Sequence, residues 1–360
     1  MCNTTLNVIT LLNKFRKQDE FFFVALRTLV VASAIKRIRL VFILGLLPVL
    51  FLSGNTAVAI EYPSAVVRII VGFPPGNATD TVARTLASML SETFNGAPFV
   101  IENRPGAAGS IGTSAVAKAD PNGLTLLVGS SGTLAINPWL YKNLPYDPIK
   151  DFAPITQLVS LPMYVVVHPS VPANSLAELV ALAKQKPGAL NYGSSGDGSS
   201  NHLAAAVLAA TTGMDLTHVP YKGSGPALTD LLAGRLSLMV DTAPAVLQYI
   251  KAGKVKVLAV TKPSRTAILP DVPTVSESGY PGFDAQAWLG FLAPSGTPQA
   301  TIDALAKALA KILTSKSFVT KMASLGAEPV GGTPAEFAVH ISAELKRWRG
   351  VIEKIGIEKQ

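Results

Sequence analysis

The feature that most constrains the fold is a repeated alternation of short apolar runs with amphipathic segments. The first run, residues 66–71 (VVRIIV), is apolar and β-branched, as in a strand that is covered on both faces. The turn Phe73-Pro-Pro-Gly76 follows it, and residues 79–94 then show helical spacing of apolar side chains. The same order recurs as far as Val260. Strands that alternate with helices predict an α/β fold with mainly parallel pairing.

The last part of the chain has a different character. Residues 298–313 and 334–355 have the pattern of long amphipathic helices, and each begins with a proline, whose missing N–H costs nothing at that position. The chain has 360 residues, and those beyond position 59 are enough for two domains. Since no low-complexity linker separates them, we expect the chain to cross between two lobes more than once through short hinge strands.

The N-terminus has the order of a secretory signal peptide. A basic cluster at 36–39 precedes an apolar run over 40–52 and the small-residue site Ala57-Val58-Ala59. The run is shorter than the ~20 residues that a membrane-spanning helix needs. We therefore predict a signal peptide over 36–59, cleavage after Ala59 and export to the periplasm, with a permanent membrane anchor as the alternative. Residues 1–35 are interpreted as an over-long start or as part of an unusually long leader.

Charge and cysteine content exclude several classes of protein. Of the net charge of +8, residues 1–59 contribute 7 − 2 = +5, which leaves 24 basic and 21 acidic residues beyond them. That part has no run of Lys and Arg, so we expect no nucleic-acid partner. The single cysteine is Cys2, so the exported chain is predicted to have no disulfide and no thiolate nucleophile or metal ligand. We expect neither a cofactor nor a bound metal.

Three loops that contain glycine and other small residues each follow a predicted strand and precede a predicted helix. They are residues 72–80, residues 129–133 with Asn137 just beyond, and residues 192–200. Ligands bind at this edge of open α/β sheets, where helix N-termini offer unpaired N–H groups and a positive dipole end. None of the loops has a phosphate-binding lysine or an arginine. Together they predict a cleft that holds a small carboxylate through backbone donors.

Catalytic motifs are poorly represented. The two Gly-Ser-Ser-Gly segments lack the final glycine of a G-x-S-x-G nucleophile elbow, and the four histidines are scattered. A serine hydrolase that uses Ser195 with His202 as its base is therefore the disfavoured alternative. Asp241 ends an apolar strand and either caps the next helix or faces the cleft. Trp288 is interpreted as a core residue in preference to a ligand platform.

Seven segments in this order and spacing identify a resemblance that covers nearly all of residues 62–350. They are YPSAVVRIIVGFPPG with Thr-Asp (62–80), VIENRPGAAGSIG (100–112), NPWLYKNLPYDPIKDFAPI (137–155), NYGSSGDGSSNHLAA (191–205), HVPYKGSGPALTDLLAGRLSLMVD (218–241), KVKVLAVTKPSRTAILPDVPTVSESGYPGF (254–283) and the stretch from Trp288 to Pro298. The chain resembles the substrate-binding proteins of tripartite tricarboxylate transporters, the Bug family.

The resemblance implies a type II periplasmic-binding fold, in which two lobes with mixed sheets flanked by helices enclose a ligand. Lobe I would comprise 62–163 plus 283–360, and lobe II 164–282. It also implies a receptor without enzymatic activity that captures a small organic acid as a monomer and delivers it to a large and a small integral membrane subunit. An orphan carboxylate sensor that feeds a signalling partner shares every one of these features and stays open.

In such a receptor, backbone N–H groups and ordered waters from the loops after the first strand of each lobe hold the carboxylate. The residues that the resemblance assigns to ligand binding are Phe73, Gly76, Asn77, Ala78, Thr79, Asp80, Ser130, Ser131, Asn137, Ser195, Gly196, Ser199, His202, Tyr221, Lys222 and Asp241. One departure is Asn77-Ala78, where the family usually has Gly-Gly or Gly-Ser. Asn77 tolerates a left-handed backbone, and the Ala78 methyl group bears on ligand size and water positions.

Overall fold

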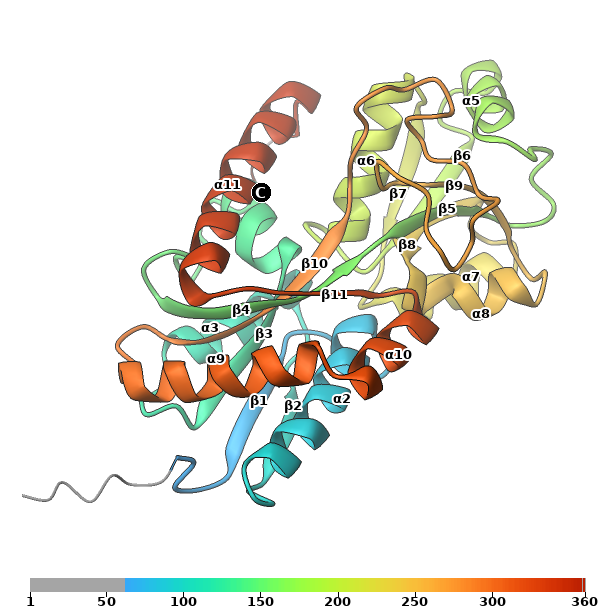
Figure 1. The fold of residues 1–360 in the computed structure, drawn as a ribbon. Helices are drawn as coiled ribbons and strands as arrows, with labels where there is room; N and C mark the ends of the chain where they lie inside the picture. The colour runs from blue at the N-terminus through green and yellow to red at the C-terminus, as the bar shows by residue number, and fades with distance from the viewer. Residues whose placement is uncertain (1–61, 358, 360) are drawn as a thin grey trace, which may run out of the picture. The chain divides into compact units, whose positions relative to one another are not determined.

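The computed structural model describes residues 62–357 and 359 (Figure 1). The predicted signal peptide and its cleavage site lie outside these residues. Within the described part, no helix is both long enough and apolar enough to cross a membrane.

A six-stranded sheet with the order β11-β4-β10-β3-β1-β2 forms the centre of the first lobe. Its strands are β1 (Val67–Val71), β2 (Phe99–Asn103), β3 (Thr125–Ser130), β4 (Phe152–Leu161), β10 (Ala287–Pro294) and β11 (Glu328–Gly331). Successive residues of β1 point to opposite faces, as the pleat of a strand requires. Ile69 belongs to the core that also contains side chains of α2 (Ala78–Thr93) and α9 (Gln299–Leu313). Ile70 belongs to the core that contains side chains of α3 (Ser110–Ala117) and α11 (Pro334–Ile355).

A five-stranded sheet with the order β7-β6-β8-β5-β9 forms the second lobe. Its strands are β5 (Met163–Val167), β6 (Leu190–Ser194), β7 (Leu216–Pro220), β8 (Leu238–Thr242) and β9 (Lys256–Val260). Val165 packs toward α5 (Leu176–Gln185) and α6 (Ser200–Thr212), and its neighbour Val166 packs toward α7 (Ser224–Leu232) and α8 (Ala243–Lys251). Both sheets are therefore covered on both faces, which explains their continuous apolar runs.

Shorter elements complete the first lobe. They are the 3₁₀ turn η1 (Ala107–Gly109), the π-helical turn η2 (Gly132–Ile136), α4 (Asn137–Leu140) and α10 (Lys316–Leu325). The long C-terminal helix α11 begins with a capping box, because the Thr333 hydroxyl accepts from the Glu336 N–H and the Glu336 carboxylate accepts from the Thr333 N–H.

The chain crosses between the two sheets twice. β4 ends at Leu161 and β5 begins at Met163, and the chain returns between the end of β9 and the start of β10 (Figure 1). One side chain ties the two crossings together, since the Thr261 hydroxyl donates to the carbonyl oxygens of Met163 at 3.2 Å and Ala285 at 2.8 Å.

The expectation of mainly parallel pairing is wrong. Among the described residues four strand pairs are parallel, and the other five are antiparallel. β10 runs antiparallel to β3 and β4, and β5 runs antiparallel to β8 and β9. The cause is the double crossing, because β4 continues into β5 without a helix between them. An alternation of strands and helices does not reveal such strands.

Candidate functional site

In the first lobe, the turn between β1 and α2 is fastened by Asp80. The carboxylate is 2% exposed and accepts hydrogen bonds from the Gly76 N–H at 2.9 Å, the Arg84 guanidinium at 2.9 Å and the Asn103 amide at 2.8 Å. Burial raises the pKa of Asp80, but these hydrogen bonds and the Arg84 charge outweigh burial and hold the pKa below its usual value. Asp80 thus fixes the shape of the turn from behind.

The left-handed residue of this turn is Gly76, with φ +81°. Asn77 is extended, with φ −67° and ψ 159°, and its side chain caps α2 by accepting from the Thr79 N–H at 2.7 Å. Asn77 is therefore the N-cap of α2.

In the second lobe, the loop between β6 and α6 is organised around Asn201. Its side-chain oxygen accepts from the Ser195 N–H at 3.2 Å, the Ser199 hydroxyl at 2.6 Å and the His202 N–H at 3.0 Å. Its amide nitrogen donates to the Ser195 hydroxyl at 2.9 Å and to the Asp241 carboxyl at 3.1 Å. Sequence reasoning missed Asn201. The signal for it was an amide residue in the first helical turn after a Gly/Ser loop.

Asp241 lies near the end of β8 and is 2% exposed. Its Oδ1 accepts from the Thr242 N–H at 2.7 Å, and α8 has Thr242, without a side-chain cap, at its N-cap position. Asp241 therefore does not cap α8, and its side chain lines a cavity between the sheets. Burial raises the pKa of this carboxyl, although hydrogen bonds from Ser224, Thr242 and Asn201 act in the opposite direction.

Two cavities lie between the sheets, and Phe73 and Ser195 line both of them. The smaller cavity, here called the deep compartment, has a volume of about 40 Å³. Its other polar and small lining residues are Asn77, Ala78, Thr79, Ser130, Ser199, Ser200, Asn201, Ser224, Asp241 and Thr242. A space of this size accommodates a carboxylate group or one or two water molecules.

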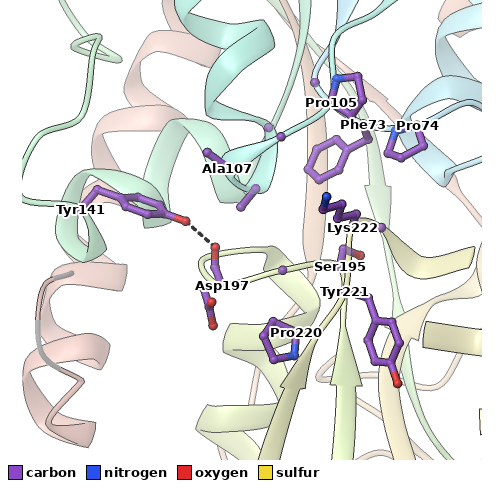
Figure 2. Close-up of a pocket in the computed structure, with 16 residues that line it drawn as sticks. Phe73, Pro74, Pro105, Ala107, Tyr141, Ser195, Asp197, Pro220, Tyr221 and Lys222 are labelled. Atoms are coloured by element: carbon purple, nitrogen blue, oxygen red, sulfur yellow. Dashed lines mark hydrogen bonds between the residues drawn. The ribbon is translucent and has the colours of Figure 1, made fainter. Parts of the chain in front are cut away.

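The larger cavity, here called the outer compartment, has a volume of about 490 Å³. Residues 72–74, 105–109, 195–197 and 220–223 line it, together with Tyr141. Figure 2 shows the Lys222 amine turned into this space, whereas the Tyr221 ring points away from it. The Tyr221 hydroxyl instead donates to Asp230 at 2.6 Å. Tyr221 therefore contributes its backbone and not its hydroxyl to the cavity wall.

The segment 105–109 was absent from the residues expected at the site. Its Ala107 and Ala108 have left-handed backbones, with φ +45° and +48°. Such a conformation costs roughly 1–2 kcal/mol per non-glycine residue. The segment also packs closely on the first turn, because a Cβ at Gly72 would lie 2.6 Å from the Gly109 carbonyl oxygen. The signal in the sequence was the glycine-rich run 105–112, which only the resemblance used.

Two residues that were expected to line the first-lobe wall contact the second-lobe loop instead. The Ser131 hydroxyl lies 2.8 Å from the Ser200 hydroxyl. With its amide nitrogen toward Gly198, Asn137 donates to the Gly198 carbonyl at 3.0 Å and its oxygen accepts from Ser110. These contacts join the lobes beside the compartments.

His202 does not form a catalytic pair with Ser195 in the described part of the chain. Its Nδ1 accepts from the Gly198 N–H at 3.1 Å, while the Ser195 hydroxyl contacts Asn201 and Ser224. Burial and the neighbouring His218 lower the pKa of His202 to about 3. The two imidazole rings are stacked, with centroids 4.0 Å apart and planes 7° apart. Burial, together with the stacked His218 ring, therefore keeps His202 neutral.

Asp197, His202 and His218 are close enough to suggest a metal site, with potential ligand atoms within 4.8 Å of one another. However, the nitrogen lone pairs of nearly parallel rings run side by side, whereas the ligands of one ion must converge on it. The three side chains do not fit a metal centre in this arrangement.

Trp288 is a core residue, as the sequence indicated. It is 3% exposed, its ring meets the Phe337 ring edge-on, and its Nε1 donates to Glu344 at 2.9 Å.

Of the expected ligand-binding residues, most line a compartment and five do not. Phe73, Asn77, Ala78, Thr79, Ser130, Ser195, Gly196, Ser199, Tyr221, Lys222 and Asp241 line one or both compartments. Gly76, Asp80, Ser131, Asn137 and His202 line neither of the two and instead hold the surrounding loops.

Comparison with known proteins places the chain in one family. Residues 82–357 match the model of the tripartite tricarboxylate transporter family receptor. Protein BugT of Bordetella pertussis is 38% identical over 296 residues, which cover 82% of this chain and 90% of the relative.

Solved structures agree. An R. palustris protein solved with adipate has a TM-score of 0.81 at 39% identity, and the match covers 83% of this chain and 100% of that one. The periplasmic binding protein BugD has a TM-score of 0.79 at 38% identity, with 83% and 100% covered. MatC from Rhodopseudomonas palustris, with bound malate, has a TM-score of 0.77 at 34% identity, with 81% and 100% covered.

These matches confirm the expected two-lobed periplasmic-binding fold and the expectation of a receptor in place of an enzyme. The chain belongs to the tripartite tricarboxylate transporter family of periplasmic receptors.

Proposed function

We propose that this receptor captures a small carboxylate in the periplasm and delivers it to a large and a small integral membrane subunit. The observation that carries the proposal is the pair of compartments between the two sheets, which share Phe73 and Ser195 in their walls. The small one is lined by hydroxyl, amide and carboxyl side chains beside Leu161, Ala287 and Leu289. Relatives that were solved with adipate and malate support a carboxylate as the ligand class.

The deep compartment is suited to the carboxylate because two helices begin at it. Ala78 opens α2, and Ser200 opens α6, so the positive ends of both helices point toward the same small space. Hydroxyls of Ser130 and Ser195 lie around it as further donors. Each hydrogen bond to a charged acceptor contributes ~1.5–3 kcal/mol. Four or five of them, less the cost of closing the lobes, give micromolar affinity, about −8 kcal/mol.

The remainder of the ligand occupies the outer compartment in this proposal. Phe73, Pro74, Tyr141 and Pro220 supply apolar surface there, and Lys222 supplies a cation. The closing units are the two lobes drawn from the sequence, 62–163 with 283–360 and 164–282. We further propose that the protein acts as a monomer after the signal peptide is removed.

A thermal-shift screen of organic acids tests the proposal. A ligand at a hundredfold excess over its Kd stabilises the folded state by about 2.7 kcal/mol. For a chain of this size, that predicts a rise in melting temperature of roughly 4–10 °C. Adipate, malate and their neutral diamides form matched pairs, and only the acids should act. A panel of acids without a single stabilising member would contradict the proposal.

A further inference from the structure

A buried carboxyl group stands in the compartment that we assign to the ligand carboxylate. Asp241 is 2% exposed and lines the deep compartment. Its hydrogen-bond partners are uncharged: the Thr242 N–H at 2.7 Å, the Thr242 hydroxyl at 3.4 Å and the Asn201 amide at 3.1 Å. Within residues 62–357 it has no salt bridge.

Asp80 is a buried carboxylate of the same fold that is paired with a cation. It is also 2% exposed, but the Arg84 guanidinium lies 2.9 Å from it and neutralises its charge. Asp241 has no such partner. An isolated buried charge is costly, and two carboxylates that share one site cannot both ionise easily.

None of the other titratable groups near Asp241 pairs with it as a cation. Those on the elements packed against β8 are Tyr164 of β5, Tyr192 of β6, His202 of α6, Asp230 of α7, and Tyr249 and Lys251 of α8. The Tyr164 hydroxyl bonds to Thr266, and Asp230 pairs with Arg235. From the first lobe, Asp80 pairs with Arg84. The groups that shift the pKa of Asp241 are all uncharged.

We propose that Asp241 takes up one proton from solvent when the ligand carboxylate enters the deep compartment, so that capture is coupled to protonation of the receptor. The inference rests on the proposed function. The balance is simple: ionised Asp241, one solvent proton and the ligand carboxylate become a complex in which one proton serves two carboxyl groups. Neutral Asp241 then offers an O–H donor where the ionised form would repel the anion.

The coupling has a defined sign. Ligand binding raises the pKa of Asp241, so the complex holds more protons than the free receptor. Affinity therefore falls as pH rises through the window between the free and bound pKa values, by up to about tenfold per pH unit. The affinity depends most steeply on pH where Asp241 is ionised in the free receptor and neutral in the complex.

The test is isothermal titration calorimetry of the wild-type receptor between pH 5.5 and 9, with the strongest stabilising acid from the screen. At each pH the titration is repeated in phosphate and Tris, whose ionisation enthalpies differ, so that the protons taken up are counted directly. We expect an uptake that approaches one proton over part of the range, together with falling affinity at high pH. Asp241→Asn should show neither effect, because its side chain is always neutral.

His218→Asn is the matched control, since His218 is a half-buried imidazole beside the same loop, where its ring bonds to the Ser194 hydroxyl. It should keep the pH dependence of the wild type. The inference would be overturned if the wild-type affinity did not change with pH and no protons were taken up. It would also be overturned if the pH dependence disappeared in His218→Asn. Loss of all binding in a folded Asp241→Asn, with amino acids as the preferred ligands, would instead show that an ionised Asp241 binds an ammonium group.

The wild-type proton count does not depend on how well the variant folds. Failure of the inference is also separable from failure of the proposed function. If no acid binds at any pH, the proposed function fails before the proton question arises. If acids bind without proton uptake, only the role of Asp241 is lost.

Discussion

The Tyr141 hydroxyl, in the first lobe, donates a hydrogen bond of 2.7 Å to the backbone carbonyl of Asp197, in the second lobe (Figure 2). Both residues line the outer compartment. In the lobe closure that we propose, the Tyr141 hydroxyl has this partner only when the lobes are together. The contact therefore contributes to the closed state and not to the stability of either lobe alone.

Removal of this contact should weaken ligand binding. For Tyr141→Phe we expect Kd to rise about 2- to 10-fold, the value of one net hydrogen bond of ~0.5–1.5 kcal/mol. Titration calorimetry measures the change, and most of it should lie in faster dissociation. Tyr249→Phe, in α8 and away from both compartments, is the control and should bind normally. An unchanged Kd in Tyr141→Phe would show that this contact does not stabilise the closed state.

Asp80→Ala should weaken both the fold and ligand binding. The substitution leaves the Gly76 N–H and the Asn103 amide without their carboxylate partner, and urea unfolding should show a loss of about 2–3 kcal/mol. The half-exposed Arg84 adds little to this figure. Asp303→Ala, on the exposed face of α9, should change stability by less than about 0.5 kcal/mol. Equal effects of the two substitutions would refute the role given to the Asp80 carboxylate.

Acid should destabilise the receptor through His202. Its pKa is lowered to about 3 from 6.5, so between these values the unfolded chain binds a proton that the folded chain does not. Stability is therefore lost as pH falls through this window, by up to about 1.4 kcal/mol per pH unit. Urea unfolding at pH 4, 5, 6 and 7 should show a shallower pH dependence for His202→Asn. Parallel curves for the two proteins would mean that His202 does not carry this effect.

Ala78 should set the size of acid that fits the deep compartment. Ala78 lies in the cavity wall at the start of α2. Ala78→Gly should improve the affinity for 2-methyl-substituted acids relative to the unsubstituted parents, and Ala78→Val should do the reverse. Competition titrations measure the ratio. If both substitutions shift the ratio in the same direction, the methyl group does not limit the ligand.

The exported protein should begin at Ile60. N-terminal sequencing of protein from the periplasmic fraction checks the predicted cleavage after Ala59. A membrane-bound form that retains residues 1–59 would support the permanent anchor.

The sequence contained enough to place the strands that have an apolar run and a following helix. β1 and α2 were expected at 66–71 and 79–94 and lie at 67–71 and 78–93. β4 and β10 were not expected, because each pairs with strands far away in the chain, and β4 continues into β5 without a helix between them. Their signal is tertiary, and local periodicity does not contain it.

The candidate site, like the fold, could be predicted only in part. Loop composition located the glycine and serine turns at the cleft, since helix N-termini and small residues gather there for general reasons. It could not show that Asp80 faces its own turn or that Asn201 connects Ser195 to Asp241. Those contacts depend on where side chains point after folding, and a single sequence does not encode that in any fixed spacing.

The Thr261 hydroxyl bonds to both Met163 and Ala285 and so joins the two crossings into a single hinge. In the closure that we propose, two crossings joined in this way act as one hinge. Ligand occupancy is then expressed as one angle between the two lobes. A membrane partner that touches the rims of both lobes needs to measure only that angle to distinguish a loaded receptor from an unloaded one, whatever the chemical identity of the cargo.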